Sequence, residues 1–331
     1  MSSVHECAVG VDIGATKIAA GLVDGSGRVL ASQTVPTPEA GGEEAFHAVV
    51  QVVGQIKQHA QRHDLCIRGV GVGTAGQVDS KKGAVRSATI NLPEWGGIPL
   101  AERIRAEVEL PVRIDNDGNV ALLAEVWAGA AQGHEHALGL TLGTGIGGGV
   151  VTGGRILHGT WGGAAELGHV CVNLGGPRCT CGSNGCMEVY ASGRGMVERL
   201  QERLMARPGD ASAAARAYVS KHGLDRVTAA LVFAWARAGD KLACETLDEA
   251  NAALAYGVTS LIHVFNPTVV VVGGGVVAAN PSIVPELAER VHGLGMPSLV
   301  QAVSITAARF GAWSGVIGAA ALILQDEAVY G

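Results

Sequence analysis

The chain repeats one layout, first in VGVDIGATKIAAGLVDGSGRVL (residues 9–30) and again in ALGLTLGTGIGGGVVTGGRIL (residues 137–157). Each stretch holds an apolar strand, a glycine turn, a second strand, another glycine turn and a closing Gly-Arg-Val-Leu or Gly-Arg-Ile-Leu. Glycine turns between strands look alike in unrelated proteins, so chance similarity is the alternative explanation. If the repeat is an internal duplication, the molecule has two similar halves that face each other across a cleft.

Strands alternate with helices around this repeat, which predicts an α/β fold. Apolar residues at helical spacing predict a helix over 43–63, and a short apolar run predicts a buried strand over 67–73. Further along, we expect a helix over 99–108, a strand ending at Asp115, a helix from near Gly118, Ala-rich helices over 192–264, a surface loop over 207–217 that enters a helix, a buried strand over 267–275 and a final helix after residue 312. At 331 residues the chain is long enough for two domains.

Composition and charge exclude several classes of protein. The net charge is −6 and we find no cluster of Lys or Arg, so the chain lacks the basic surface of a nucleic-acid binder. The N-terminus has no signal-peptide pattern, and the apolar tracts are interrupted by glycine and too short to span a bilayer. We therefore expect a soluble, cytoplasmic protein with no membrane partner. Thiols stay reduced in the cytosol, so clustered cysteines are expected to bind metal.

Three strands run into glycine turns, in VDIGATK (11–17), LTLGTGIGGG (140–149) and VVVVGGGVV (269–277). Such turns present successive backbone N–H groups to phosphate oxygens, and together they predict a nucleotide site. Thr16 and Thr144 add hydroxyls, and Asp12 could hold Mg²⁺ through water. No Walker-type motif is present, and the G-x-G-x-x-G within GTGIGGG leads into a strand, which argues against a dinucleotide fold.

Polar residues gather in IDNDGN (114–119), where a strand ends and a helix begins. Helix capping by Asn or Asp explains one such residue. The cluster of Asp115, Asn116, Asp117 and Asn119 exceeds the needs of a cap, and at the carboxyl end of a strand it would face a cleft. We therefore expect a functional carboxylate here.

The stretch HVCVNLGGPRCTCGSNGCME (169–188) holds four of the seven cysteines and one histidine. His169, Cys179, Cys181 and Cys186 form a Cys₃His set that suits tetrahedral zinc, and four protein ligands leave no open position for a water, so the metal would be structural. Cys171 is a spare thiol. A disulfide is the alternative if the protein meets an oxidising compartment.

These motifs together resemble the ROK family of sugar kinases and related repressors, in the actin-like ATPase superfamily. The resemblance covers essentially the whole chain and rests, in order, on DIGATK (12–17), NLPEW (91–95), DNDGN (115–119), LTLGTGIGGG (140–149), AAELGH (164–169), CTCGSNGCME (179–188) and VVVVGGG (269–275). The first phosphate turn starts at residue 12, which leaves no room for the N-terminal helix-turn-helix of the repressor branch. The resemblance therefore implies a kinase.

The resemblance implies an α/β fold of two actin-like (ribonuclease H-like) lobes around a central cleft. Residues 1–116 with about 313–331 would form the N-terminal lobe, because the C-terminal helix crosses back to it. Residues 117–312 would form the C-terminal lobe, with a small structural zinc loop over 169–186. ATP and Mg²⁺ would lie between the glycine turns, and the sugar deeper in the cleft.

Matched position by position, Asp117 corresponds to the catalytic base of the family. The sugar contacts correspond to Gly76, Asn91, Asn116, Glu166, His169 and Glu188. The glycine turns that would hold ATP comprise Asp12, Gly14, Ala15, Thr16, Lys17, Gly143, Thr144, Gly145, Gly273, Gly274 and Gly275. The zinc ligands correspond to His169, Cys179, Cys181 and Cys186. One ring nitrogen of His169 can bind zinc while the other meets the sugar, so the metal would shape the sugar pocket and take no part in the chemistry.

The implied reaction is transfer of the ATP γ-phosphoryl group to O6 of a hexose, with glucose as the first expected substrate. N-acetylmannosamine and N-acetylglucosamine are the alternatives, because two of the motifs also look similar to the N-acylmannosamine kinase branch. Two alternatives belong to other classes. A catalytically silent sugar sensor would not need the base Asp117, so the presence of Asp117 argues against it. A zinc hydrolase needs an open metal position, which the four-ligand set does not leave. Small residues on the helices after residue 192 allow close packing between copies, so we expect a homo-oligomer, a dimer or a dimer of dimers.

Overall fold

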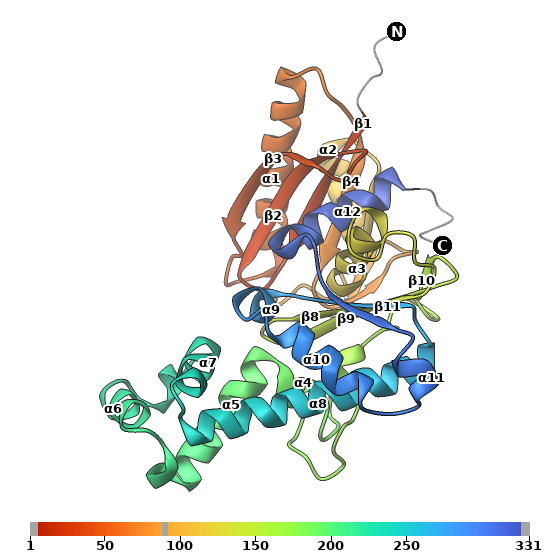
Figure 1. Ribbon diagram of the computed structural model, residues 1–331. Coiled ribbons are helices and arrows are strands. Elements are labelled where there is room, and N and C mark those ends of the chain that lie inside the picture. The colour runs from red at the N-terminus through yellow and green to blue at the C-terminus, as the bar shows by residue number, and fades with distance from the viewer. Residues whose placement is uncertain (1–5, 88–91, 326–331) are drawn as a thin grey trace.

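The computed structural model describes residues 6–87 and 92–325, which form two five-stranded sheets and a short hairpin (Figure 1). In spatial order the first sheet comprises β3 (Val29–Pro36), β2 (Lys17–Asp24), β1 (Glu6–Ile13), β4 (Cys66–Thr74) and β7 (Val112–Asn116). The second comprises β10 (Arg155–Ile156), β9 (Ile146–Thr152), β8 (Ala137–Leu142), β11 (Val269–Gly273) and β12 (Ser304–Ala307). The hairpin pairs β5 (Gln77–Asp79) with β6 (Ala84–Ser87).

The two sheets have the same topology. In the first, β1, β2 and β3 pair antiparallel in sequence, and β4 and β7 then add parallel to β1. In the second, β8, β9 and β10 pair antiparallel, and β11 and β12 add parallel to β8. The repeated layout predicted from residues 9–30 and 137–157 is therefore confirmed, and it extends to the two parallel strands that follow each repeat.

The first sheet is covered on both faces. Alternate residues of β1 point to opposite sides, so Cys7, Val9 and Val11 join a core with α1 (Gly42–Arg62) and α2 (Leu100–Val108). Ala8 points the other way and packs with Val316 of α12 (Ser314–Leu324). A strand that is buried on both faces is apolar almost throughout, which explains its continuous apolar sequence.

The helix α12 lies directly on the backbone of the first sheet. A Cβ atom at Gly10 of β1 or at Gly71 of β4 would overlap the carbonyl oxygens of Val316 or Ala319, so only glycine permits this approach. On its other side α12 packs against α3 (Asp117–Ala128), and the two helices lie between the two sheets (Figure 1). The predicted return of the C-terminal helix to the first sheet is confirmed.

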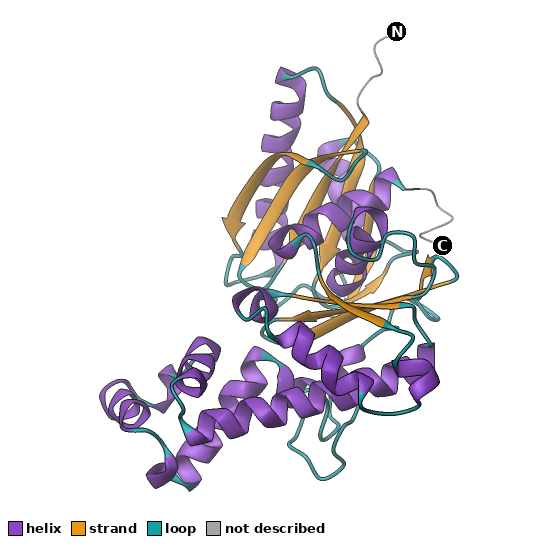
Figure 2. Ribbon diagram, viewed as in Figure 1, coloured by secondary structure: helices purple, strands orange, loops and turns teal. Residues whose placement is uncertain are grey.

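Helices cover the outer face of the second sheet. The long α8 (Lys241–Phe265) and α10 (Ile283–His292) share a core with β8, β9 and β11. A second helical group, built around Leu200 and Trp235, extends away from the sheets (Figure 2). The remaining helices are α4 (Glu188–Ala191), α5 (Gly193–Ala206), α6 (Ala213–His222), α7 (Ala229–Arg237), α9 (Gly275–Ala279) and α11 (Pro297–Val300).

The structure refines two of the expected bounds and adds elements that the sequence did not predict. The expected loop over 207–217 contains a 3-10 turn at Pro208–Asp210 and the start of α6, whose N-cap Ser212 accepts the Ala215 N–H. The helix expected from near Gly118 begins one residue earlier, because Asn116 caps it. The hairpin β5–β6 and strand β12 are too short for periodicity to reveal. Among the described residues no helix is both long and apolar enough to cross a membrane.

Candidate active site

The loop from β7 into α3 is held by side-chain caps. Asn116 is the N-cap of α3: its Oδ1 accepts the Gly118 N–H at 2.8 Å and the Asn119 N–H at 3.4 Å. Its Nδ2 donates to the carbonyl oxygen of Gly76 at 3.0 Å, which brings together two residues that were predicted to meet the sugar. The capping explanation is therefore correct for Asn116, and it leaves Asp117 as the first residue of the helix.

The Asp117 carboxyl has an unusual environment. Its Oδ1 accepts the Gly118 N–H at 2.9 Å. Burial raises the pKa of Asp117 to about 7, and the charges of Asp12 and Glu166 add to this effect, against the lowering by the Gly118 and Asn116 hydrogen bonds. A carboxyl with a pKa near neutral pH can accept a proton from a substrate hydroxyl and release it again.

The turn between β1 and β2 presents its backbone to solvent. The Gly14 N–H donates to the Lys17 carbonyl oxygen at 3.0 Å, and the Thr37 hydroxyl donates to the Gly14 carbonyl oxygen at 2.7 Å. Ala15, Thr16 and Lys17 are exposed. Beside the turn, Asp12 is partly buried, and this burial raises its pKa to about 6 against the opposing charge of Lys17.

The second and third glycine turns lie side by side. Between β8 and β9 the Gly143 N–H donates to the Gly145 carbonyl oxygen at 2.9 Å, and Thr144 is exposed. A Cβ atom at Gly274 would overlap the Leu142 backbone, so the turn of Gly273, Gly274 and Gly275 packs against the end of β8. The start of α5 also docks here, because the Gly193 N–H donates to the Gly143 carbonyl oxygen at 2.8 Å.

Acidic side chains connect the second turn to the rest of the site. Glu188 is 8% exposed; its Oε2 accepts the Ile146 N–H at 2.9 Å and its Oε1 accepts from Arg194 at 3.1 Å. The Glu166 side chain is open to solvent, yet partial desolvation raises the pKa of its carboxyl, His169 opposes this, and Glu188 adds to it. The charges of His169 and Glu188 therefore act on Glu166, so the three side chains lie in one neighbourhood; their contact with a sugar stays a prediction.

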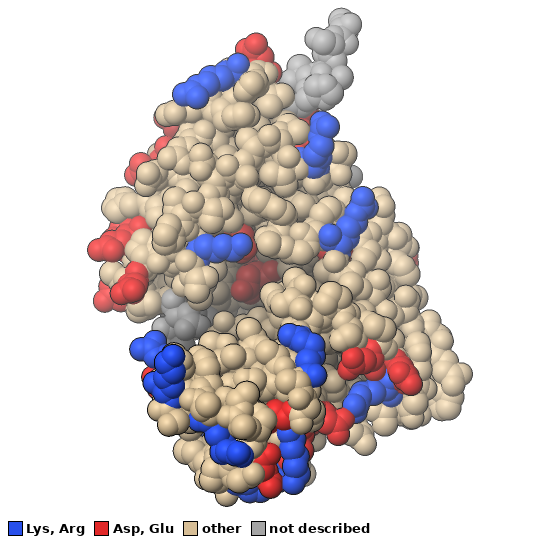
Figure 3. All heavy atoms as spheres, turned by 60° about the vertical axis from the view of Figure 1, so that its left-hand side comes forward, with Lys and Arg blue, Asp and Glu red and all other residues tan. Residues whose placement is uncertain are grey.

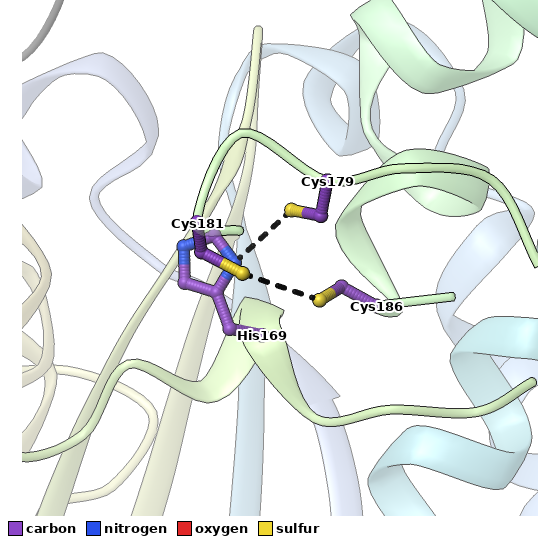
Figure 4. A group of neighbouring side chains, drawn as sticks. All are labelled: His169, Cys179, Cys181 and Cys186. Atoms are coloured by element: carbon purple, nitrogen blue, oxygen red, sulfur yellow. Dashed lines mark hydrogen bonds between the residues drawn. The ribbon is translucent and has the colours of Figure 1, made fainter. Parts of the chain in front are cut away.

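The predicted thiol–imidazole cluster forms. One ligand atom from each of His169, Cys179, Cys181 and Cys186 lies within 4.8 Å of the others, and the four side chains point toward one another (Figure 4). The Cys179 Sγ lies 3.5 Å from the His169 Nδ1, and the Cys181 Sγ lies 3.6 Å from the Cys186 Sγ. The ligands of a tetrahedral zinc ion lie about 3.5–3.8 Å apart. The four residues could therefore hold a metal ion.

The molecular surface is hollowed between the part that contains the first sheet and the helical part below it, and acidic side chains lie inside the hollow (Figure 3).

The ROK family model matches residues 8–326. The chain belongs to the ROK family.

Relatives of this ROK chain align along nearly their full length. The chain is 35% identical to the glucokinase of Thermotoga maritima over 318 residues, with 96% of this chain and 97% of that protein covered. It is 31% identical to an N-acetyl-D-glucosamine kinase of Escherichia coli over 328 residues, with 96% and 99% covered. A ROK family glucokinase from Streptomyces griseus, solved with glucose and AMPPNP, is 35% identical, with a TM-score of 0.80 over 97% of this chain and 100% of that one. The fold is the actin-like α/β fold of ROK kinases, as predicted.

Sequence reasoning missed two polar residues that this ROK chain places at the site. Arg194 pairs with Glu188, and its backbone N–H donates to the Thr144 carbonyl oxygen at 3.3 Å. His158 contacts Asp115 of the β7–α3 loop at 2.7 Å. Neither residue belongs to a motif whose spacing signals chemistry. The predicted sugar contact Asn91 lies outside the described residues.

Proposed function

We propose that the chain is an ATP-dependent hexose kinase that phosphorylates the 6-hydroxyl group, with glucose as its sugar. The observation that carries the proposal is the Asp117 carboxyl, with a pKa of about 7, at the start of α3 and within the electrostatic influence of Asp12 and Glu166. The similarity to the glucokinases of T. maritima and S. griseus supports glucose over other hexoses.

Asp117 acts as the general base. In its ionised form it accepts the proton of the sugar 6-hydroxyl and directs that oxygen toward the γ-phosphorus of ATP. Phosphoryl transfer depends mainly on such positioning and on stabilising the charge of the phosphoryl oxygens. Closure of the two lobes, which we divide at residues 116/117 and 312/313, excludes water as a competing acceptor.

The glycine turns cradle the phosphates. The Gly14 and Gly143 N–H groups close the two turns internally, so the phosphoryl oxygens would meet the backbone N–H groups that follow them, at Ala15, Thr16, Thr144 and Gly145, while the turn of residues 273–275 packs against the second turn. The Asp12 and Asp117 carboxylates repel each other, and this repulsion contributes to the raised pKa of Asp117. Such a pair of carboxylates suits Mg²⁺. Asp12 would hold the Mg²⁺ ion, which would neutralise phosphate charge.

The sugar lies between the β7–α3 loop and the neighbourhood of Glu166, His169 and Glu188. Carboxylates accept hydrogen bonds from ring hydroxyls, and hydrogen bonds to charged groups each contribute about 1.5–3 kcal/mol. Because Asn116 already caps α3 and binds Gly76, its position relative to the sugar is fixed before the sugar arrives. Fixed groups of this kind give affinity without a further loss of side-chain entropy.

We further propose that the His169–Cys179–Cys181–Cys186 cluster holds a structural zinc ion that fixes the His169 ring. In Cys181→Ser we expect loss of the metal together with lower thermal stability and weaker glucose binding, since binding of a structural metal is coupled to folding. Metal content and melting temperature measured on the same sample check this. Cys171→Ser, which removes the neighbouring spare thiol, is the matched control and should retain metal. A metal-free Cys181→Ser protein as stable as wild type would contradict the proposal.

The kinase proposal is tested by measuring ADP release from MgATP in the presence of separate sugars. The panel contains glucose, N-acetylglucosamine, N-acetylmannosamine, mannose and fructose, with a sample lacking sugar as the blank. Turnover with glucose far above the other sugars supports the proposal. A folded, zinc-loaded sample that turns over no sugar contradicts it and favours a sugar sensor.

N-acetylglucosamine is the second candidate substrate. The similarity to the E. coli N-acetyl-D-glucosamine kinase favours it, although the identity is lower than to the T. maritima glucokinase. Competition in a mixture distinguishes the two sugars. The true substrate, added at a concentration near its own KM, lowers the rate at which the other sugar is phosphorylated. This comparison needs a mixture of the two sugars in which the two sugar phosphates are quantified separately, because ADP release reports only their sum.

A further inference from the structure

A buried hydrogen bond joins the loop that carries Asp117 to the second sheet. The His158 Nε2 lies 2.7 Å from the Asp115 Oδ2, and the two side chains are only 9% and 1% exposed. We propose that His158 is a positioning residue for phosphoryl transfer, which acts through Asp115 to fix the loop that carries the base. This inference rests on the proposed kinase function and adds a residue to its machinery.

Asp115 connects His158 to the residues on both sides of Asp117. Its Oδ1 accepts the Asn116 N–H at 2.7 Å and the Asn119 Nδ2 at 3.0 Å, so one carboxylate holds the residues on both sides of Asp117. Since a carboxylate only accepts hydrogen bonds, the His158 Nε2 is the donor, and this selects the tautomer of the ring. The position of Asp117 therefore depends on a carboxylate whose second oxygen is oriented by His158.

His158 belongs to a segment of the second sheet, whereas Asp115 belongs to β7 of the first. It follows β10 of the second sheet, and its carbonyl oxygen accepts the Gly162 N–H at 2.9 Å and the Ala164 N–H at 3.3 Å, which closes a tight turn. The turn packs on the hairpin beside the first sheet, because a Cβ atom at Gly162 would overlap the Val78 carbonyl oxygen. In addition, the Arg86 guanidinium lies 4.6 Å from the centre of a Trp161 ring.

The same segment leads directly into the sugar neighbourhood. Glu166 follows the turn, and the 3-10 helix Leu167–His169 begins at the next residue. The hydrogen bond from His158 to Asp115 therefore ties the segment that ends in Glu166 to the loop that carries Asp117. In a reaction governed by alignment, a displacement of about 1 Å between base and hydroxyl costs on the order of 100-fold in rate.

The effect is expected in kcat. The His158 ring hydrogen-bonds to Asp115 and the Asp117 carboxyl accepts from the Gly118 N–H, so the loss of His158 leaves the base present but loosens its position. His158→Leu, which cannot donate, should lower kcat about 30- to 100-fold while the KM for glucose changes less than about threefold. His158→Gln places an amide donor near the position of Nε2 and should recover most of this loss.

The measurement compares steady-state kinetics and melting temperatures of wild type, His158→Leu and His158→Gln. His134→Leu is the matched control, because the His134 ring also binds a side chain, Thr268 at 2.7 Å, but outside the site. That variant should retain wild-type kcat. His158→Asn, which is too short to reach Asp115, replaces the Leu variant if the latter does not fold.

Three results would overturn the inference: wild-type kcat in folded His158→Leu, a loss confined to KM, or an equal loss of kcat in His158→Gln. A purely structural role would lower the melting temperature of His158→Leu and leave kcat per folded molecule unchanged. If the wild-type protein phosphorylates no sugar, the proposed kinase function fails. The inference is then decided by crystal structures, in which an Asp117 carboxyl in the same place in wild type and His158→Leu would refute it.

Discussion

The turn after β1 and the turn after β8 occupy equivalent places in two sheets of identical topology, yet they carry different chemistry. The first has Asp12 at the end of its strand, where the second has the neutral Thr141. The second turn receives its carboxylate from a distant element, since Glu188 of α4 accepts the Ile146 N–H. The repeated scaffold therefore supplies a glycine turn twice, whereas acids are added separately: Asp12 beside the proposed phosphate turn in the first half, and Glu188 beside the proposed sugar site in the second.

The largest effect is expected at Asp117, where the first sheet leads into α3. Asp117→Asn keeps the size and the cap of the helix but removes the base. General-base catalysis is worth roughly 10²–10⁴-fold, so we expect kcat to fall about 1,000-fold while the glucose KM stays within a few-fold. Asp24→Asn, in an exposed turn of the same sheet, is the control and should keep full kcat. Full activity of Asp117→Asn would show that Asp117 is not the general base.

Exchanging one residue tests the comparison of the two turns directly. Asp12→Thr gives the first turn the residue that the second turn carries at this place, and Thr141→Ser makes a conservative change in the second. We expect kcat to fall about 100-fold in Asp12→Thr, the size of effect seen when one group that stabilises transition-state charge is removed. It should also need more Mg²⁺. Measuring kcat over a range of Mg²⁺ concentrations gives both the maximal kcat and the Mg²⁺ concentration that is needed. Equal values for Asp12→Thr and Thr141→Ser would show that the difference between the two turns does not affect catalysis.

The acid of the second half should act on sugar binding. Glu188→Gln keeps the shape of the side chain but weakens its hydrogen bonds to charged and polar donors, and the loss of one charge-assisted bond corresponds to about 10- to 100-fold in affinity. We expect the glucose KM to rise by this amount with a smaller change in kcat. Arg194→Gln, which breaks the ion pair but leaves the carboxylate, should show a weaker form of the same effect. A Glu188→Gln variant that loses only kcat would place Glu188 with the phosphates.

The raised pKa values of the first half predict a dependence on pH. Asp117 must be ionised to accept a proton, so kcat/KM should fall about tenfold per unit below a pH of about 7 and level off above it. In the residual activity of Asp117→Asn the limb near pH 7 disappears, and only the fall below about pH 6 that belongs to Asp12 remains. A flat profile between pH 5.5 and 8 in wild type would contradict the assignment of this carboxyl.

The same shift affects stability with a defined sign. Because the folded pKa of Asp117 exceeds the unfolded value, the folded state holds the proton longer, and stability falls as pH rises from about 4 to about 7. Asp117→Asn removes this loss. Its melting temperature should therefore exceed that of wild type by more at pH 8 than at pH 5.

The sequence revealed the parts of the site that follow local rules. The pattern IDNDGN at the end of a strand predicts a helix cap, which Asn116 forms, and a functional acid, the role that we propose for Asp117. One histidine and three cysteines within eighteen residues predict a metal-binding cluster, and these four side chains do lie together. It did not reveal His158, because its partner Asp115 lies 43 residues away and a single histidine after a strand carries no pattern. Arg194 was missed for the same reason: its role comes from the docking of α5 on the second turn.

The contact between α12 and the first sheet has a consequence for biosynthesis. One face of β1 and β4 stays uncovered until residues 314–324 have left the ribosome, although these strands are among the first parts of the chain to emerge. Gly10 and Gly71, which admit the helix backbone, give this face little apolar surface with which to collapse on its own. Long-range contacts of this kind slow folding and expose unfinished surfaces to aggregation. We therefore expect a ribosome-bound chain that ends before α12 to expose this face of the first sheet and to aggregate more readily than the full chain.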